Sequence, residues 1–137
     1  MDKSLITIGE LREKLSSIFH DIIPESIARR CIKALNMFPN NEEFEKARLE
    51  AKDSVCQLLN QIASMENQPM FKIQTLVRKA SPTTQLFLME RIVYLDSLLR
   101  KANPLEQVTV PSDFAAFVRM YLIEEYNKKL KDNPQKL

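Results

Sequence analysis

The chain has 137 residues, of which 45% are hydrophobic and 28% charged, and its net charge is +2 at pH 7. This length suits one domain with one core, and the composition argues against a disordered chain and against a strongly basic nucleic-acid-binding protein. Gly9 is the only glycine, where average usage of about 7% would give roughly ten. Because tight hairpins and phosphate-binding loops favour glycine, we expect helices separated by proline and asparagine rather than a β-sandwich or a nucleotide-binding fold.

The sequence predicts neither a secretory signal peptide nor a membrane-spanning helix. No N-terminal stretch has the pattern of a signal peptide, and no apolar run approaches the ~18 residues that a membrane span requires. The two cysteines, Cys31 and Cys56, lie inside helical patterns, which is typical of reduced thiols rather than of a disulfide framework. We therefore expect an intracellular protein of the cytoplasm or nucleus with no membrane association.

The first three predicted helices follow from their start signals. A capping box at Thr7 begins the first helix, which ends before Pro24. The second helix is predicted over about 24–37 and the third over about 42–65, with Asn41 as its N-cap. Apolar residues recur at every third or fourth position in each of them, so each helix is expected to bury one face.

The middle of the chain predicts a short helix and then a long one. The short helix covers about 70–79, and Ser81 followed by Pro82 begins the next helix. That helix, over about 82–101, is apolar on nearly every side, which is typical of a helix at the centre of a bundle. Residues 105–110 favour extended backbone, but without a second predicted strand we interpret them as an ordered loop.

The last helix is predicted to begin at Pro111-Ser112-Asp113, and residues 128–137 are expected to form a frayed tail. The sequence as a whole therefore predicts an all-α fold. We expect a single helical domain over 1–137, a compact bundle of about six helices around the central helix, with no sheet.

No catalytic or metal site is indicated by the polar residues. His20 is the only histidine, and Cys31 could approach it across the turn at Pro24. However, the cysteines lie on or beside apolar stripes, where burial raises the pKa of a thiol and makes it inert. One histidine and two scattered cysteines also lack the paired spacing of zinc ligands. We therefore expect a protein that is not an enzyme and that uses no metal or cofactor.

Basic residues occur in several helices, and Arg29, Arg30 and Lys33 form a candidate basic face on the second one. Acidic residues are interleaved with these clusters, and the excess of Lys and Arg over Asp and Glu is only 20 − 18 = 2. A phosphate-binding surface is normally a stripe of one sign. Nucleic-acid binding through mixed basic helix faces is therefore the less favoured alternative.

Binding of another protein is the leading hypothesis, in the role of an adaptor or regulatory subunit. The partner segment would lie in a groove between helices or on the face of the last helix. The candidate contact residues on that helix are Phe114, Phe117, Tyr121 and Tyr126. Tyrosine is enriched at interfaces because its ring is apolar and its hydroxyl is polar. A homo-oligomer is compatible with either hypothesis.

A resemblance to a known family concerns residues 70–127. The segments that carry it are 71–77, Ser81-Pro82, the run Arg91-Ile92-Val93-Tyr94-Leu95-Asp96-Ser97-Leu98-Leu99, and 111–118. They resemble the first three helices of a cyclin box, with Ser97 in place of the usual arginine. The resemblance implies a helical regulatory domain. It carries over no kinase-contact residue, because 112–127 contains no lysine and the chain ends before the later cyclin-box helices.

Overall fold

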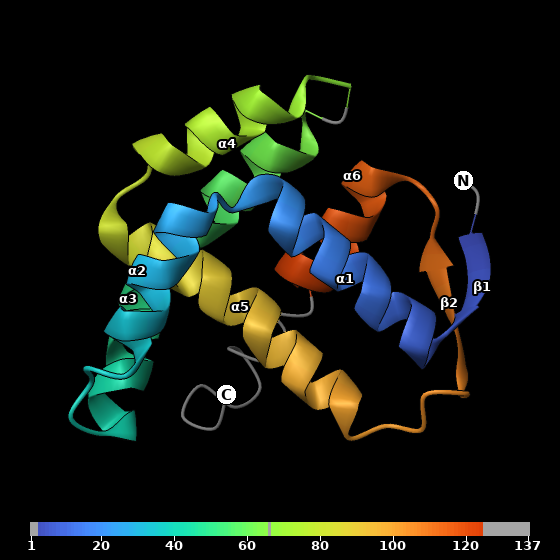
Figure 1. The fold of residues 1–137 in the computed structure, drawn as a ribbon, viewed down its shortest axis with the longest axis horizontal. Helices are drawn as coiled ribbons and strands as arrows, with labels where there is room; N and C mark the ends of the chain where they lie inside the picture. Colours follow the sequence, from blue (N-terminus) through green and yellow to red (C-terminus); the bar gives the residue numbers. More distant parts are fainter. Residues whose placement is uncertain (1–2, 66, 125–137) are drawn as a thin grey trace.

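A computed structural model describes residues 3–65 and 67–124 (Figure 1). Six α-helices, a π-helix and two strands occur in these residues. In chain order they are β1 (Lys3–Thr7), α1 (Ile8–Ile22), α2 (Glu25–Leu35), α3 (Asn41–Ala63), α4 (Met70–Lys79), α5 (Pro82–Arg100), β2 (Gln107–Pro111), α6 (Phe114–Phe117) and the π-helix η1 (Val118–Glu124). The chain is mostly helical, as predicted. The expected tail at 128–137 lies outside the described residues.

Side-chain caps fix the helix starts. At α1 the hydroxyl of Thr7 accepts a hydrogen bond from the Glu10 amide at 3.1 Å, and Glu10 Oε1 accepts one from the Thr7 amide at 3.0 Å, which confirms the capping box. Ser81 caps α5, with Pro82 as the first helical residue, as predicted. For α3 the prediction was one residue late: Asn40 is the cap, and its Oδ1 accepts from the Glu43 amide at 2.8 Å.

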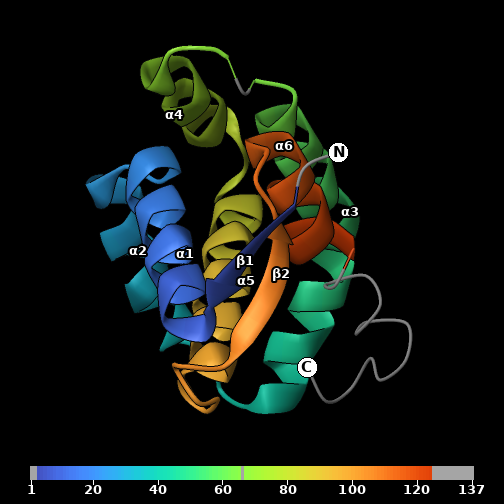
Figure 2. The same cartoon turned by 90° about the vertical axis from the view of Figure 1, so that its right-hand side faces the viewer.

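The expectation of no sheet is wrong. Strands β1 and β2 form a two-stranded antiparallel ribbon in which Ile6 pairs with Val108 and Leu5 with Thr109 (Figure 2). The segment that we interpreted as a loop therefore has a partner, and that partner comes from the opposite end of the described chain. β-Branched residues in both strands suit extended backbone, but the pairing is non-local, so the pattern around either strand alone does not predict it.

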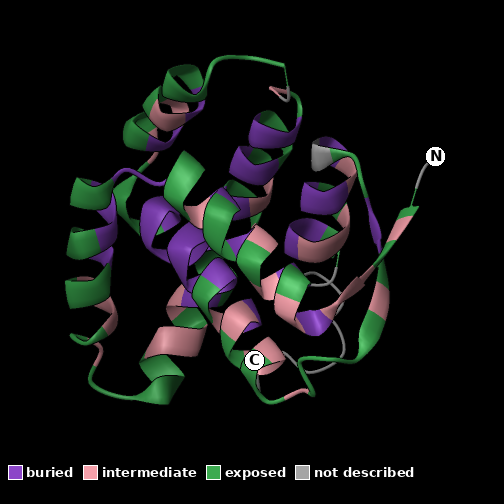
Figure 3. Ribbon diagram, turned by 45° about the vertical axis from the view of Figure 1, so that its right-hand side comes forward, coloured by how far each residue is buried: buried purple, intermediate pink, exposed green. Residues whose placement is uncertain are grey.

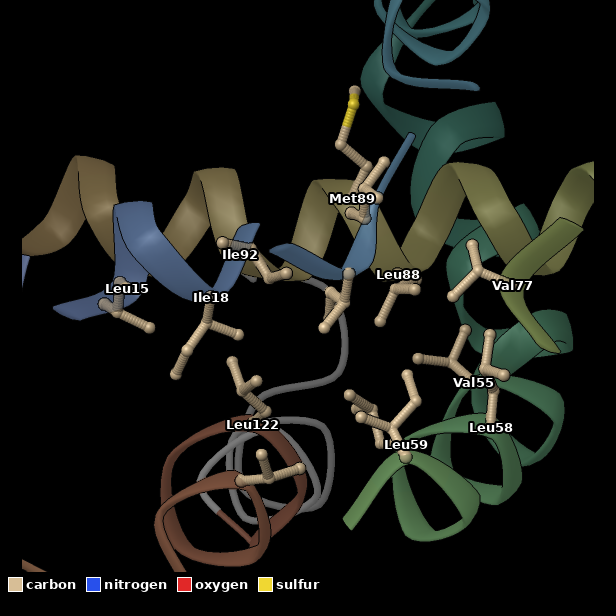
Figure 4. Packing of buried hydrophobic residues seen from close by; sticks show 14 of the residues in the cluster. Leu15, Ile18, Val55, Leu58, Leu59, Val77, Leu88, Met89, Ile92 and Leu122 are labelled. Carbon is tan, nitrogen blue, oxygen red and sulfur yellow. The ribbon is translucent and has the colours of Figure 1, made fainter. Parts of the chain in front are cut away.

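The centre of the fold is shared by α3 and α5, which corrects the prediction of one central helix over 82–101. Helix α5 packs against α1, α2 and α3, while α3 also contacts α4, α6 and η1. Apolar side chains from most of the elements form this core (Figure 4), among them Leu15 and Ile18 of α1, Leu59 of α3, Val77 of α4, Leu88 of α5 and Leu122 of η1. The sequence did not predict the central position of α3, because this helix carries many polar residues.

Helix α5 changes from buried to more exposed along its length. Residues 84–92 are all buried, whereas residues 93–100 are mostly half-buried or exposed (Figure 3). Val93, the first residue after the buried stretch, keeps 45% of its surface exposed. The second half of α5 therefore offers a surface beside α1, although its sequence is nearly as apolar as that of the first half.

The last helix starts where it was predicted but is not a regular α-helix. Asp113 caps α6 through a 2.9 Å hydrogen bond from the Ala116 amide, and after Phe117 the chain continues as the π-helix η1. Val118, Leu122 and Ile123 of η1 are buried. The buried guanidinium of Arg91 donates a 2.7 Å hydrogen bond from Nη2 to the carbonyl of Tyr121, and so ties η1 to α5.

Candidate functional site

A groove of about 540 Å³ lies between α1 and the second half of α5. Its apolar lining comes from Leu15 and Phe19 of α1 and from Ile92 and Val93 of α5. On α1, Leu15 and Phe19 are separated by about one turn and share a face. On α5, Ile92 and Val93 are neighbours, and Ile92 is buried whereas Val93 is 45% exposed. The volume falls within the roughly 300–1,000 Å³ that is usual for ligand pockets. An apolar side chain of a binding partner would be desolvated in this groove.

Charged residues border the same groove. Asp96 of α5 accepts hydrogen bonds from two arginines: Arg12 Nε lies 3.3 Å from Asp96 Oδ1, and Arg100 Nε lies 2.9 Å from Asp96 Oδ2. The side chain of Arg100 remains 67% exposed and that of Arg12 34% exposed. An arginine has five N–H donors, whereas a carboxylate accepts about four hydrogen bonds. Asp96 therefore leaves donors and positive charge on both arginines for another acceptor.

Two other hollows and several exposed apolar side chains also occur on the surface. Two hollows of about 410 and 280 Å³ lie between α3 and the start of α5, and both are lined in part by Ser54 and Thr84. Exposed apolar side chains also occur on other elements, singly at Leu5 on β1 and Ile32 on α2, and as the adjacent pair Met70 and Phe71 on α4. Single exposed apolar residues are normal on a protein surface. The α1–α5 groove differs because its apolar lining and its paired charges are contiguous.

Of the predicted contact residues on the last helix, the structure describes the side chains of Phe117 and Tyr121, and both pack at least partly into the interior. Phe117 is fully buried, its ring stacks on that of Tyr121 with centroids 5.1 Å apart, and Lys14 Nζ lies 4.7 Å from its centroid. Tyr121 is half-buried, and its hydroxyl donates to the carbonyl of Thr109 at 3.5 Å. In this conformation Phe117 is a core residue without a surface for a partner. The side chain of Phe114 and all of Tyr126 lie outside the described part.

The predicted basic face on α2 is exposed but largely engaged within the fold. Arg29 forms an ion pair with Glu25 one turn earlier. Arg30 Nη2 donates a 2.9 Å hydrogen bond to Gln85 Oε1 on α5. Lys33 is exposed on the same helix. The three residues thus share one helix, but two of the cations already have partners.

The structure brings together no catalytic pair from the candidates considered in the sequence. His20 is exposed, and its ring lies edge-on to Phe19 with centroids 5.7 Å apart. Cys31 is a buried free thiol; burial raises the pKa of this thiol above its usual value, and the charge of Arg30 opposes that effect only in part. A raised pKa keeps the thiol protonated and weakly nucleophilic.

Residues 3–65 and 67–124 contain no group of three or more His, Cys, Asp and Glu side chains placed to hold a metal ion. None of the helices in these two ranges combines the length and the apolar character that crossing a membrane requires.

The sequence did not predict the charged residues at the border of the groove, nor where in the fold the groove lies. The i,i+4 spacing of Asp96 and Arg100 is a local signal that could have indicated their ion pair. Arg12 is 84 positions from Asp96 in the chain, so its part in the cluster depends on how α1 crosses α5. The groove itself could not be read from either helix alone.

Comparison of the chain with protein-family models, with curated proteins and with solved structures found no match. The resemblance of residues 70–127 to a cyclin box therefore stays a prediction.

Proposed function

We propose that this chain is a non-enzymatic protein-interaction module, an adaptor or regulatory subunit, whose α1–α5 groove receives a segment of another protein. The observation that carries the proposal is the contiguity of an apolar lining with a charged border in one groove of about 540 Å³. Interfaces commonly combine an apolar centre that excludes water with polar groups at the rim. In this groove Val93 offers exposed apolar surface, and Arg100 offers an exposed charge.

The groove is favoured over the last helix as the binding surface. Phe117, Val118 and Leu122 are fully buried in the core, so a partner could reach them only if α6 and η1 left their places. By contrast, Val93 is accessible in the folded chain. Binding at the groove would therefore require no unfolding of the domain.

The proposal is tested by affinity capture from extract of the source cells, because we expect the protein to act inside the cell. The bait is the full chain, either unchanged or carrying Val93→Glu, which places a charge in the apolar lining. Ile32→Glu on α2 is the matched control, since Ile32 is 52% exposed and Val93 45%. A protein held by the unchanged chain and by the Ile32 variant, but lost from the Val93 variant, is the expected result.

Two outcomes would contradict this function. Capture that survives Val93→Glu would remove the groove from the interaction. Capture that is abolished by nuclease treatment or by moderate salt would favour the nucleic-acid alternative, because phosphate contacts weaken steeply with salt. Light scattering of the unchanged chain shows whether a second copy of the chain is the partner instead.

A further inference from the structure

We infer that the exposed face of α4 binds single-stranded nucleic acid, through contacts of its cations with phosphates and stacking of a base on Phe71. This activity is separate from the protein partner proposed for the groove, because α4 contributes no residue to the lining of the groove. The two surfaces can therefore be tested independently.

Four exposed residues of α4 share one face of this helix, which lies at the edge of the molecule (Figures 1 and 2): Phe71, Lys72, Arg78 and Lys79. Phe71 and Arg78 are seven positions apart, as are Lys72 and Lys79, so each pair lies along one line of the helix about two turns apart. The two buried residues of α4 lie on the opposite side. The ring of Phe71, a residue that is 63% exposed, therefore shares its face with three cations.

No acidic residue of α4 opposes these cations. The chain has no Asp or Glu between Glu66 and Glu90, and none of the ion pairs among the described residues involves α4. Lys72 Nζ lies 3.4 Å from the neutral acceptor Gln68 Oε1. A surface of one sign is the electrostatic property that phosphate binding requires.

The positive surface continues from the end of α4 onto α2. Gln85 of α5 is buried, and its Nε2 donates hydrogen bonds to the carbonyls of Val77 at 2.9 Å and Arg78 at 3.3 Å. Its Oε1 accepts a 2.9 Å hydrogen bond from Arg30 Nη2. Arg30 is thereby held beside the end of α4, and the exposed Lys33 follows one turn later on α2.

Two exposed acids border this surface. The carbonyl of Asp21 accepts a 2.9 Å hydrogen bond from a side chain of α4, and Asp53 directly precedes a residue that lines a hollow of about 280 Å³ together with Lys79. Arg29 and Glu25 pair with each other and add no net charge. Against the two acids stand five cations: Arg30, Lys33, Lys72, Arg78 and Lys79. This excess of three exceeds the net charge of +2 of the whole chain, so positive charge is concentrated here.

The exposed ring favours a single strand over other polyanions. Bases of a single strand are free to stack on an aromatic side chain, whereas those of a duplex are already stacked on one another. An acidic peptide supplies carboxylates but no planar group beside each charge. A membrane surface would need a broader apolar face, and the apolar residues Ile73 and Val77 of α4 are buried in the core.

The inference is tested by fluorescence anisotropy of the full chain with labelled oligouridylate, oligothymidylate and a duplex, each of about twelve nucleotides. We expect both single strands to bind more tightly than the duplex. Their affinity should fall with salt, with a slope of log K against log salt of about −2 to −3, because three or four phosphate contacts each contribute about −0.7.

Variants then locate the contact on α4. Phe71→Ala should weaken binding of the single strands by at least about fivefold and leave the salt slope unchanged, because it removes stacking but no charge. Lys72→Gln and Arg78→Gln should each make the salt slope shallower by about 0.7. Leu5→Ala is the matched control for Phe71, since Leu5 is 62% exposed, and Lys101→Gln, at an exposed position after α5, is the control for the cations. Neither control should change binding.

Three results would overturn the inference: no binding of single strands at low salt, equal affinity for the duplex with no response to Phe71→Ala, or binding of a polyglutamate peptide or of phosphatidylserine vesicles in place of the oligonucleotides. Val93→Glu should leave oligonucleotide binding unchanged. Loss of protein capture with this variant but not of oligonucleotide binding would support two separate surfaces, and loss of both would contradict the assignment of the nucleic acid to α4.

Discussion

Arg48 and Glu90 join the two central helices, α3 and α5, through an ion pair inside the protein. Arg48 Nε lies 2.9 Å from Glu90 Oε1, and the two side chains are only 5% and 9% exposed. The guanidinium also lies over the ring of Phe44, 4.7 Å from its centroid. Buried in this way, neither charge can return to water without opening the core, so loss of one partner leaves the other uncompensated.

This pair gives a prediction about stability. Arg48→Met should lower the free energy of unfolding by about 3–5 kcal/mol, because it leaves the Glu90 carboxylate buried without a counter-charge. The double variant Arg48→Met with Glu90→Leu should recover most of that loss, because it replaces both charges with apolar groups. Urea denaturation followed by circular dichroism measures both values. A double variant as unstable as the single one would show that the pair itself, and not the orphaned charge, determines stability.

At the scale of single residues, sequence patterns predicted the caps well and the burial of charge poorly. Thr7 and Ser81 are recognised because a cap depends on neighbours within three positions. The burial of Arg48, by contrast, is not predictable from its own helix, because its partner Glu90 lies 42 positions away. A helical pattern indicates which face is polar, but it does not indicate that a polar residue has a partner inside the core.

At the scale of elements, the ribbon of β1 and β2 closes the fold by pairing the start of the chain with the segment after α5. Backbone hydrogen bonds extend this closure into α1, since the Ile8 amide donates to the Glu106 carbonyl at 2.8 Å and the Gly9 amide to the Pro104 carbonyl at 3.0 Å. The start of α1 is therefore held next to the end of α5, at the charged border of the groove.

The register of the ribbon can be tested with a disulfide. Leu5 and Thr109 face each other in the ribbon, and directly opposed residues have Cα atoms about 4.5–5.5 Å apart, within reach of a disulfide. The pair Leu5→Cys with Thr109→Cys, in a background without Cys31 and Cys56, should therefore oxidise readily and raise the melting temperature. Mass spectrometry of the digested protein measures the cross-link.

A control changes the register by one position. Leu5→Cys with Val108→Cys should oxidise much less readily, because neighbouring side chains in a strand point to opposite faces. Equal oxidation of the two pairs would contradict the register described here.

Some of the elements could be predicted from the sequence and others could not. The positions of the helices were predictable because apolar periodicity and caps are local properties. The ribbon was not predictable, because each strand is short and its partner is about 100 positions away. The two strands are also not joined by a hairpin turn, which is the local signal that would have indicated their pairing. The π-helix after Phe117 was not predicted either, since its apolar residues fit the spacing of an α-helix nearly as well.

At the scale of the whole molecule, the packing determines which apolar surface is left for a partner. The face of the last helix, expected to bind, is largely used to build the core around Phe117 and Leu122. Within residues 3–65 and 67–124, the groove between α1 and α5 leaves Val93 45% exposed. The leading hypothesis from the sequence, a protein-interaction module, thus stays a prediction, and the groove is the surface that we propose for it.

The central claim is that a partner protein contacts this groove directly. The most direct measurement is photo-crosslinking in the source cells, with a photoreactive amino acid in place of Val93 and, in a parallel chain, in place of Ile32. We predict a covalent adduct to another protein from position 93 and none from position 32, because only position 93 lies in the groove. Adducts that form equally at both positions, or only at position 32, would contradict the account.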